Sequence, residues 1–396
     1  MISDKMVQFI NNSSAIRALF EEGKKLAEVV GAENVYDFSL GNPNLPPPTA
    51  VQQAMIDVLQ EEPPNFVHGY MSNSGYEDVR EKVAQSLNKR FGTKFNYENI
   101  LMTVGAAGGL NVVFKTLLNP GDEVITFAPY FGEYNSYVAN FDGKLVVVPA
   151  DTETFQPNLK ELRDKINSRT KAIIVNSPNN PSGVIYSEES IKELAEILNE
   201  KQKELGTSIY IISDEPYREL VYEDIEVPYI PNYYKNTFVG YSFSKSFSLP
   251  GERIGYLVIP SEMDDFETVV YATNVANRTL GYVNAPSLMQ RAIARCLDVP
   301  IDVSFYKKNR DVLYNGLTEL GYECVKPEGA FYLFMKAPID DDKEFCEIAK
   351  KFNLVIVPAA GFGCPGYTRL AYCVSHEKVK GSLPKFKELM DYIKSL

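Results

Sequence analysis

Three polar segments of the chain each follow a short apolar stretch. They are NSPNNPSG at Asn176–Gly183, SDEPYREL at Ser213–Leu220 and YSFSKSFSLPGERIGY at Tyr241–Tyr256. Each alone has a simpler explanation, because Asn-Asn-Pro-Ser-Gly is typical of a turn, an acid after a strand often caps a helix, and a lysine among serines is usually a solvated charge. Ligands in open α/β sheets bind at the carboxyl ends of the strands, however, so the three segments together predict one ligand site.

Short apolar stretches alternate with helical patterns between about residues 100 and 260. They are rich in Val and Ile and do not alternate with polar residues, as expected for strands buried on both faces. Between two of them, Ser187 is placed to cap a helix that Gly206 ends. This repetition predicts a mostly parallel sheet with helices on both sides. The expected strands are Ile100–Thr103, Glu123–Phe127, Lys144–Pro149, Ala172–Asn176, Ser208–Ser213 and Thr237–Ser242.

One further strand, Arg253–Ile259, follows after only ten residues, which barely allows a helical crossover, so it is expected to be antiparallel. After Pro286 the pattern changes to a long helical region at 286–318 and then to the strand-like segments FYLFMK, NLVIVPAA and YTRLAYCV. The predicted fold class is therefore α/β. It has a large domain with a mostly parallel sheet, one antiparallel strand and flanking helices, plus a smaller α+β domain.

The chain is expected to have three parts. Residues at about 12–30 predict a helix capped by Ser13 or Ser14, and the prolines that follow enforce an extended segment. We expect residues 1–45 to form this N-terminal helix and extended arm, packed with the small domain. Residues 46–285 would form the large domain, which would carry the ligand site, and residues 286–396 the small C-terminal domain.

Composition excludes several classes of partner and site. The chain has 40 Lys and Arg against 52 Asp and Glu, a net charge of −12, so nucleic acid and anionic membranes are not expected as partners. No apolar run approaches ~18 residues, and the first residues lack the pattern of a signal peptide. Two histidines and five scattered cysteines argue against a metal site and a disulfide framework. These features predict a cytoplasmic protein with reduced, mostly buried thiols.

The segment SFSKSFSLPGERIGY carries a resemblance to a known family. With the other two segments, it resembles the lysine signature of the fold-type I pyridoxal-phosphate-dependent aminotransferases, class I/II, which include the aspartate aminotransferases. The resemblance covers nearly the whole chain. It implies pyridoxal 5'-phosphate as cofactor and an enzyme that moves the amino group of an L-amino acid to a 2-oxo acid in two half-reactions. It also implies a homodimer with shared active sites.

Carried onto matching positions, the resemblance implies a role for each residue around the cofactor ring. Lys245 would attach covalently to the cofactor aldehyde and later move the proton, which requires an amine with a lowered pKa. Asp214 would pair with the pyridinium nitrogen and keep it protonated. Tyr217 and Asn180 would flank the phenolic oxygen, and Phe131 would stack on the ring.

The resemblance also implies a site for the cofactor phosphate at a helix N-terminus. Many family members have a Ser or Thr hydroxyl in the loop TVGAAGGLN, and this chain does not, so binding would depend more on backbone N–H groups. The same loop does not match the fingerprint of a dinucleotide-binding site, and this mismatch argues against a nicotinamide enzyme. The implied contacts are the N–H groups of Gly105, Ala106 and Ala107, the Ser242 hydroxyl, the Arg253 guanidinium and, from the neighbouring subunit, Tyr70.

For the substrate, the resemblance implies that Arg369 grips the α-carboxylate through two parallel hydrogen bonds. Gly41 would let the backbone approach the same carboxylate, beside Asn180. Some aspartate-specific relatives have a lysine where this chain has Ala107. Arg278 lies near the place of an arginine that reaches the side-chain carboxylate across the dimer, so aspartate or glutamate are possible donors; a surface or interface arginine is the alternative.

Two other activities stay open at this point. A β-lyase would use the same cofactor and the same early steps, so motifs cannot separate it from a transaminase. A ligand-sensing regulator of the same fold would carry a DNA-binding domain, yet only about 30 residues precede the first family motif, and they contain no basic helix-turn-helix.

Overall fold

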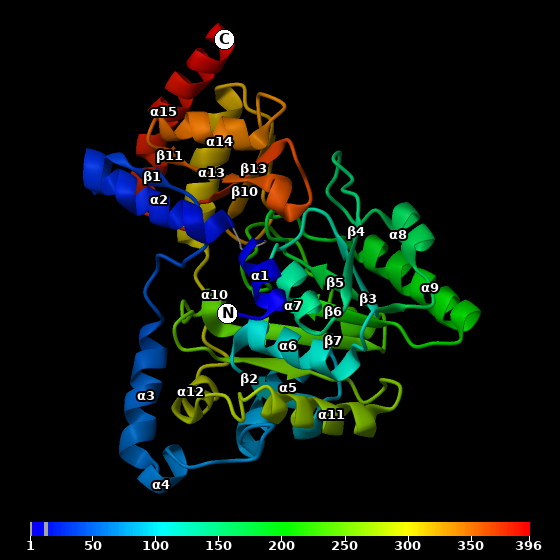
Figure 1. Ribbon diagram of the computed structural model, residues 1–396. Coiled ribbons are helices and arrows are strands. Elements are labelled where there is room, and N and C mark those ends of the chain that lie inside the picture. The colour runs from blue at the N-terminus through cyan, green and yellow to red at the C-terminus, as the bar shows by residue number, and fades with distance from the viewer. Residues whose placement is uncertain (1, 12–14) are drawn as a thin grey trace.

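A seven-stranded sheet forms the centre of the computed structural model, which describes residues 2–11 and 15–396 (Figure 1). Its strand order is β2-β8-β7-β6-β5-β3-β4, and all neighbours are parallel except β8, which is antiparallel to β2 and β7. The predicted fold class, including the one antiparallel strand, is confirmed. The strands are β2 Ile100–Thr103, β3 Glu123–Phe127, β4 Lys144–Val148, β5 Thr170–Asn176, β6 Tyr210–Asp214, β7 Thr237–Ser242 and β8 Gly255–Val258.

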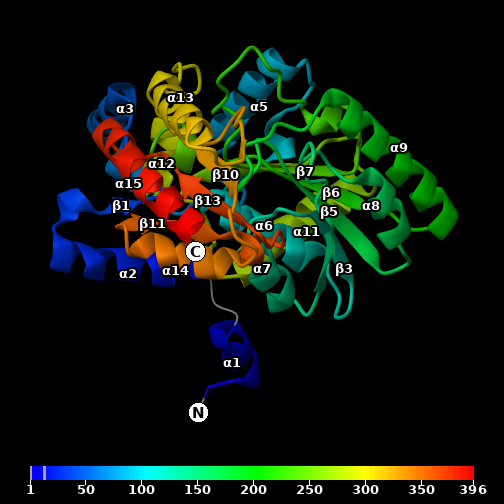
Figure 2. The same ribbon diagram turned by 90° about the horizontal axis from the view of Figure 1, so that it is seen from above.

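Helices cover both faces of this sheet, as Figures 1 and 2 show. On β5, Ile174 packs in the core beneath one layer of helices, and the neighbouring Ile173 packs in the core beneath the other. Successive strand residues point to opposite faces, so this burial on both sides explains the uninterrupted apolar strands. One layer contains α6 Gly105–Leu117, α7 Tyr134–Asn140 and α11 Phe266–Thr279; the other contains α8 Leu159–Lys165, α9 Glu188–Leu205, α5 Glu77–Phe91 and α12 Ser287–Ile293.

A four-stranded antiparallel sheet of order β12-β13-β10-β9 forms a second core. Near it, β1 Tyr36–Asp37 pairs in parallel with β11 Leu354–Val355, and α2 Ala15–Val30 contacts β11 and β12. Both α2 and β1 therefore lie against the second sheet, whereas Lys5 of α1 (Asp4–Asn11) donates to the carbonyl of Asn140 at the end of α7. The remaining elements of this part are β9 Cys324–Val325, β10 Tyr332–Lys336, β12 Val357–Pro358, β13 Tyr367–Ala371, α13 Ser304–Glu319, α14 Asp342–Lys350 and α15 His376–Ser395.

Two expected elements differ in the structure. The long helical region expected at 286–318 consists of two helices, α12 and α13, because the intervening segment 294–303 leaves the helical path around Pro300. The strand expected to start at Arg253 starts at Gly255, since Arg253 has a φ of 52°. The predicted caps Ser13 and Ser14 lie outside the described residues.

Three further helices lie in the N-terminal half: α1 Asp4–Asn11, α3 Thr49–Glu61 and α4 Pro64–Val67.

A buried ion pair fixes the chain just after β6. Arg218 donates two hydrogen bonds to the Glu215 carboxylate and two more to the backbone carbonyls of Val227 and Pro228. Both charged side chains are almost fully buried. Every donor and acceptor that this pair brings into the interior needs its partner, so the pair holds the loop after β6 against the segment at Val227 and Pro228.

Removing one member of this pair is expected to be costly. Arg218→Met leaves the Glu215 carboxylate buried without its partner and should lower the free energy of unfolding by about 3–5 kcal/mol. Arg163→Met is the matched control, because Arg163 pairs with Glu200 at the surface and should change stability by less than about 1 kcal/mol. Urea unfolding of both variants measures this, and equal midpoints would contradict it.

Candidate active site

One cavity of about 290 Å³ opens where β5, β6 and β7 end and extends to the second sheet. Its walls include Asn176, Asp214 and Ser242, each the last residue of its strand, and Arg369 from β13. The three polar segments therefore meet at one cavity, at the carboxyl ends of their strands. Eleven of the predicted site residues line this cavity: Gly41, Ala106, Ala107, Phe131, Asn180, Asp214, Tyr217, Ser242, Lys245, Arg253 and Arg369.

Lys245 lies on the one-turn helix α10 Phe243–Ser246, directly after β7. The Ser242 hydroxyl caps this turn by accepting a hydrogen bond from the Ser244 N–H. Lys245 Nζ donates to the carbonyl of Gly41 at 2.6 Å. Burial lowers the pKa of Lys245 to about 8, and the positive charges of Arg369 and Arg253 act in the same direction. A substantial fraction of this amine is therefore neutral near physiological pH, as nucleophilic chemistry requires.

Asp214 is held by one hydrogen bond and has one open oxygen. Tyr134, at the start of α7, donates its hydroxyl to Oδ2 at 2.6 Å. Oδ1 is buried and has no hydrogen-bond partner among the described residues. Burial raises the pKa of Asp214 to about 7, against the effect of the Tyr134 hydrogen bond. A buried acceptor without a donor favours a ligand with an N–H or O–H group at this point.

An anion site lies at the start of α6, beside Arg253. The Arg253 guanidinium donates to the carbonyl of Val104 at 3.1 Å and lies 3.5 Å from the Ser244 hydroxyl. Gly105 has a φ of 79°, and a Cβ there would lie 2.6 Å from Arg253 Nη2, so only glycine allows this close approach. The free N–H groups of the first helical turn and one guanidinium together suit a phosphate.

Arg369 is buried at the opposite end of the cavity, between the rings of Tyr332 and Phe362. Its Nη1 donates to Asn180 Oδ1 at 3.3 Å, while Nε is buried without a partner in the described part of the chain. A Cβ on Gly41 would overlap the hydroxyl of Tyr332, so glycine is needed there as well. The guanidinium thus keeps donors available for a carboxylate.

The comparisons with known proteins agree with this geometry. Residues 33–383 match the family model described as aminotransferase class I and II. The chain belongs to the class I and II aminotransferases. This family is generally dependent on pyridoxal phosphate.

Three relatives illustrate the similarity. An aminotransferase structure from Eubacterium rectale superposes with a TM-score of 0.96 at 49% identity, covering 100% of this chain and 99% of that one. A probable aspartate/prephenate aminotransferase from Aquifex aeolicus is 32% identical over 91% of this chain and 92% of its own. The aspartate aminotransferase of Thermus thermophilus with maleate has a TM-score of 0.88 at 28% identity, with 98% and 99% coverage.

The residues of the aminotransferase cavity fit pyridoxal 5'-phosphate. The open Oδ1 of Asp214 offers an acceptor for a pyridinium N–H, and the glycine at 105 beside Arg253 leaves room for a phosphate. The Tyr217 hydroxyl lies 2.7 Å from that of Tyr332 and faces the same space, and Phe131 adds an aromatic wall. Lys245 supplies the amine.

Tyr70 and Arg278 do not line the cavity of their own subunit. Tyr70 is 95% exposed, and Arg278 is exposed near the end of α11. Their predicted contacts across a dimer stay predictions. Within the described residues 2–11 and 15–396, no group of three His, Cys, Asp or Glu side chains is placed to hold a metal ion, and no helix is long and apolar enough to span a membrane. All five cysteines are free, and four are buried.

Sequence reasoning missed three groups that shape the site. Tyr134 holds Asp214, Tyr332 contacts both Tyr217 and Arg369, and Asn176 donates to the carbonyl of Asp214 at 2.8 Å. The only available signal was position, because Asn176 ends a predicted strand and Tyr134 follows Phe131 by three residues.

Tyr134 is expected to control the protonation of Asp214. Tyr134→Phe removes the hydrogen bond that stabilises the carboxylate, so the pKa of Asp214 should rise above about 7 by roughly one to two units. Infrared titration of the carboxyl band in the cofactor-free protein measures this shift. Tyr137→Phe, which alters another cavity tyrosine without touching that bond, is the control; equal titrations for both variants would contradict the assignment.

Proposed function

We propose that this aminotransferase binds pyridoxal 5'-phosphate in the cavity and moves the amino group of an L-amino acid to a 2-oxo acid in two half-reactions. One observation carries the proposal: a lysine with a lowered pKa and an aspartate with an open, buried oxygen line the same cavity. When bound, the cofactor supplies an electron sink for the negative charge that develops at the substrate α-carbon.

Different residues of the chain bind different groups of the cofactor. Asp214 Oδ1 accepts the pyridinium N–H and keeps that proton on the ring. Tyr217 and Asn180 hydrogen-bond the phenolic oxygen, and Phe131 covers the ring face. The other predicted residues bind the phosphate. They are the N–H groups of Gly105, Ala106 and Ala107, the side chains of Ser242 and Arg253, and Tyr70 of a neighbouring subunit.

Lys245 moves the proton. Its Nζ would hold the cofactor before substrate arrives and would then take the proton from the substrate α-carbon. A pKa of about 8 suits this step, because the amine accepts a proton readily yet releases it again near neutral pH. Asp214, Tyr217 and Lys245 are therefore the proposed catalytic residues.

Arg369 selects the substrate by its α-carboxylate. The partnerless Nε and the adjacent Nη groups present the fork that a carboxylate fits, with the Gly41 backbone and Asn180 beside it. We propose aspartate and glutamate as donors, supported by the aspartate names of the Aquifex and Thermus relatives. Arg278 would meet the second carboxylate across the interface of a homodimer. The proposed domains are 1–45, 46–285 and 286–396, and the proposed location is the cytoplasm.

A half-reaction screen tests the proposed function. The cofactor-loaded enzyme is mixed with one amino acid and no 2-oxo acid, and the cofactor absorbance is followed from the aldehyde to the amine form. Aspartate and glutamate should convert the cofactor, and Lys245→Ala should abolish conversion. Release of pyruvate from cysteine conjugates without amino transfer would instead indicate a lyase.

Arg278 is the residue that decides between dicarboxylates and other donors. Arg278→Ala should raise KM for aspartate tenfold or more and leave KM for alanine unchanged, since only the dicarboxylate would lose a charged partner. Arg163→Ala, at another surface site, is the control. An equal effect on both amino acids would remove Arg278 from the substrate site.

A further inference from the structure

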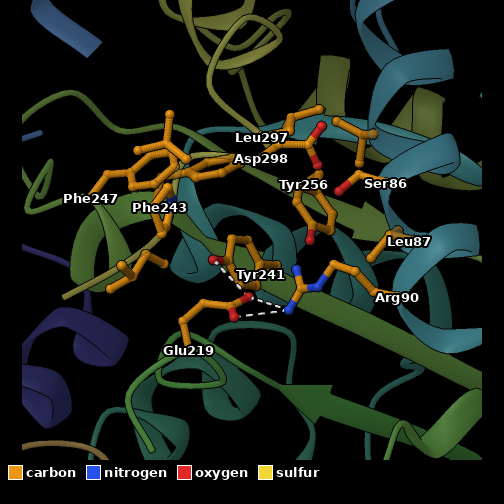
Figure 3. A pocket seen from close by; sticks show the side chains of 14 residues that line it. Ser86, Leu87, Arg90, Glu219, Tyr241, Phe243, Phe247, Tyr256, Leu297 and Asp298 are labelled. Carbon is orange, nitrogen blue, oxygen red and sulfur yellow. Dashed lines mark hydrogen bonds and ion pairs between the residues drawn. The ribbon is translucent and has the colours of Figure 1, made fainter. Parts of the chain in front are cut away.

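A second cavity, of about 330 Å³, lies apart from the active site and shares no lining residue with it (Figure 3). It is bounded by α5, by the strands β7 and β8, and by the segment 297–301 that follows α12. A volume near the lower end of the ~300–1,000 Å³ range of ligand sites suits a small molecule.

The position of this cavity connects it to both cores and to the catalytic lysine. Ile301, in its wall, packs against the core of the large sheet and against that of the second sheet. Phe243 and Phe247, on either side of Lys245 in the chain, form another part of the wall. Tyr241 donates its hydroxyl to Ser246 at 2.9 Å. A molecule in this cavity therefore touches the segment that joins the two cores and the turn that carries Lys245.

The cavity has hydrogen-bond donors that the protein does not use. Arg90 Nη2 donates to both carboxylate oxygens of Glu219, at 2.7 and 2.9 Å. Among the described residues nothing accepts from Arg90 Nε or Nη1, or from the hydroxyl of Tyr256. Figure 3 shows that hydroxyl and the guanidinium pointing toward one another. Together they present donors suited to a carboxylate.

Carboxylates lie in the same walls as the guanidinium. Glu219 borders the cavity beside Arg90, and Asp298 lines it with a side chain that is 80% exposed and whose Oδ1 lies 3.7 Å from Lys89 Nζ. A simple anion would meet repulsion from these acids, and a simple cation would meet repulsion from Arg90. A zwitterion satisfies both signs of charge. Rings of Phe243 and Tyr256 and the side chain of Leu297 add apolar surface for the rest of the molecule.

We propose that this cavity is a binding site for a free α-amino acid with an apolar side chain. Its carboxylate accepts hydrogen bonds from Arg90 and Tyr256, and its ammonium group lies toward Glu219 and Asp298. The site is separate from the proposed substrate site, where Arg369 holds the carboxylate.

Calorimetric titration of the cofactor-loaded enzyme tests this site. The probe is α-methyl-L-phenylalanine, which has both charges and no α-hydrogen, so it cannot donate an amino group. We expect binding that survives Arg369→Ala and weakens at least tenfold in Arg90→Met, whose basal transamination stays unchanged. The methyl ester and the N-acetyl derivative, which each lack one charge, should bind at least tenfold more weakly.

A second variant keeps the test independent of the Arg90–Glu219 pair. Leu297→Trp fills the cavity, leaves that pair in place and should abolish the Arg369-independent binding. The proposal is overturned if the probe does not bind, if Arg90→Met and Leu297→Trp bind it as the wild type does, or if its binding is lost only in Arg369→Ala.

Discussion

Desolvation of three ionisable side chains in one cavity is the constraint on which the site depends. Lys245, Asp214 and Arg369 are all removed from water. Burial raises the pKa of Asp214 and lowers the pKa of Lys245 and Arg369, so the neutral form of each is favoured. Asp214 Oδ1 and Arg369 Nε have no partner in the described structure. Such groups are costly in a folded protein unless a ligand satisfies them, and the class I and II aminotransferases have a charged cofactor and substrate to do so.

The fold keeps these three side chains buried although their desolvation costs free energy. Asp214 and Lys245 come from the ends of neighbouring parallel strands, and the Glu215–Arg218 pair fixes the chain directly after Asp214. Arg369 comes from the other sheet, and its hydrogen bonds reach Asn180, in the loop after β5, and the carbonyl of Ser39, just after β1. The site is therefore complete only when β13, the loop after β5 and the segment after β1 pack together.

Much of this arrangement follows from the sequence, for physical reasons that can be named. Buried parallel strands are continuous apolar runs, so β2 to β7 were predictable, and their ends located Asn180, Asp214 and Lys245. Contacts between distant segments leave no local pattern in the sequence. The Tyr134–Asp214 hydrogen bond and the position of Tyr332 could therefore not be predicted. The sequence indicated a helical region at 286–318 but not where it divides into α12 and α13. The contacts predicted for Tyr70 and Arg278 lie across a dimer interface and stay predictions.

The central claim is that burial, together with the charges of Arg369 and Arg253, prepares Lys245 for chemistry before any ligand binds. Its direct test is the pH dependence of the reaction between the cofactor-free protein and an amine-specific reagent, with Lys245→Arg identifying the signal of this residue. The account predicts that the Lys245 amine titrates with a midpoint near 8. A midpoint near the ordinary lysine value of about 10.4 would contradict it.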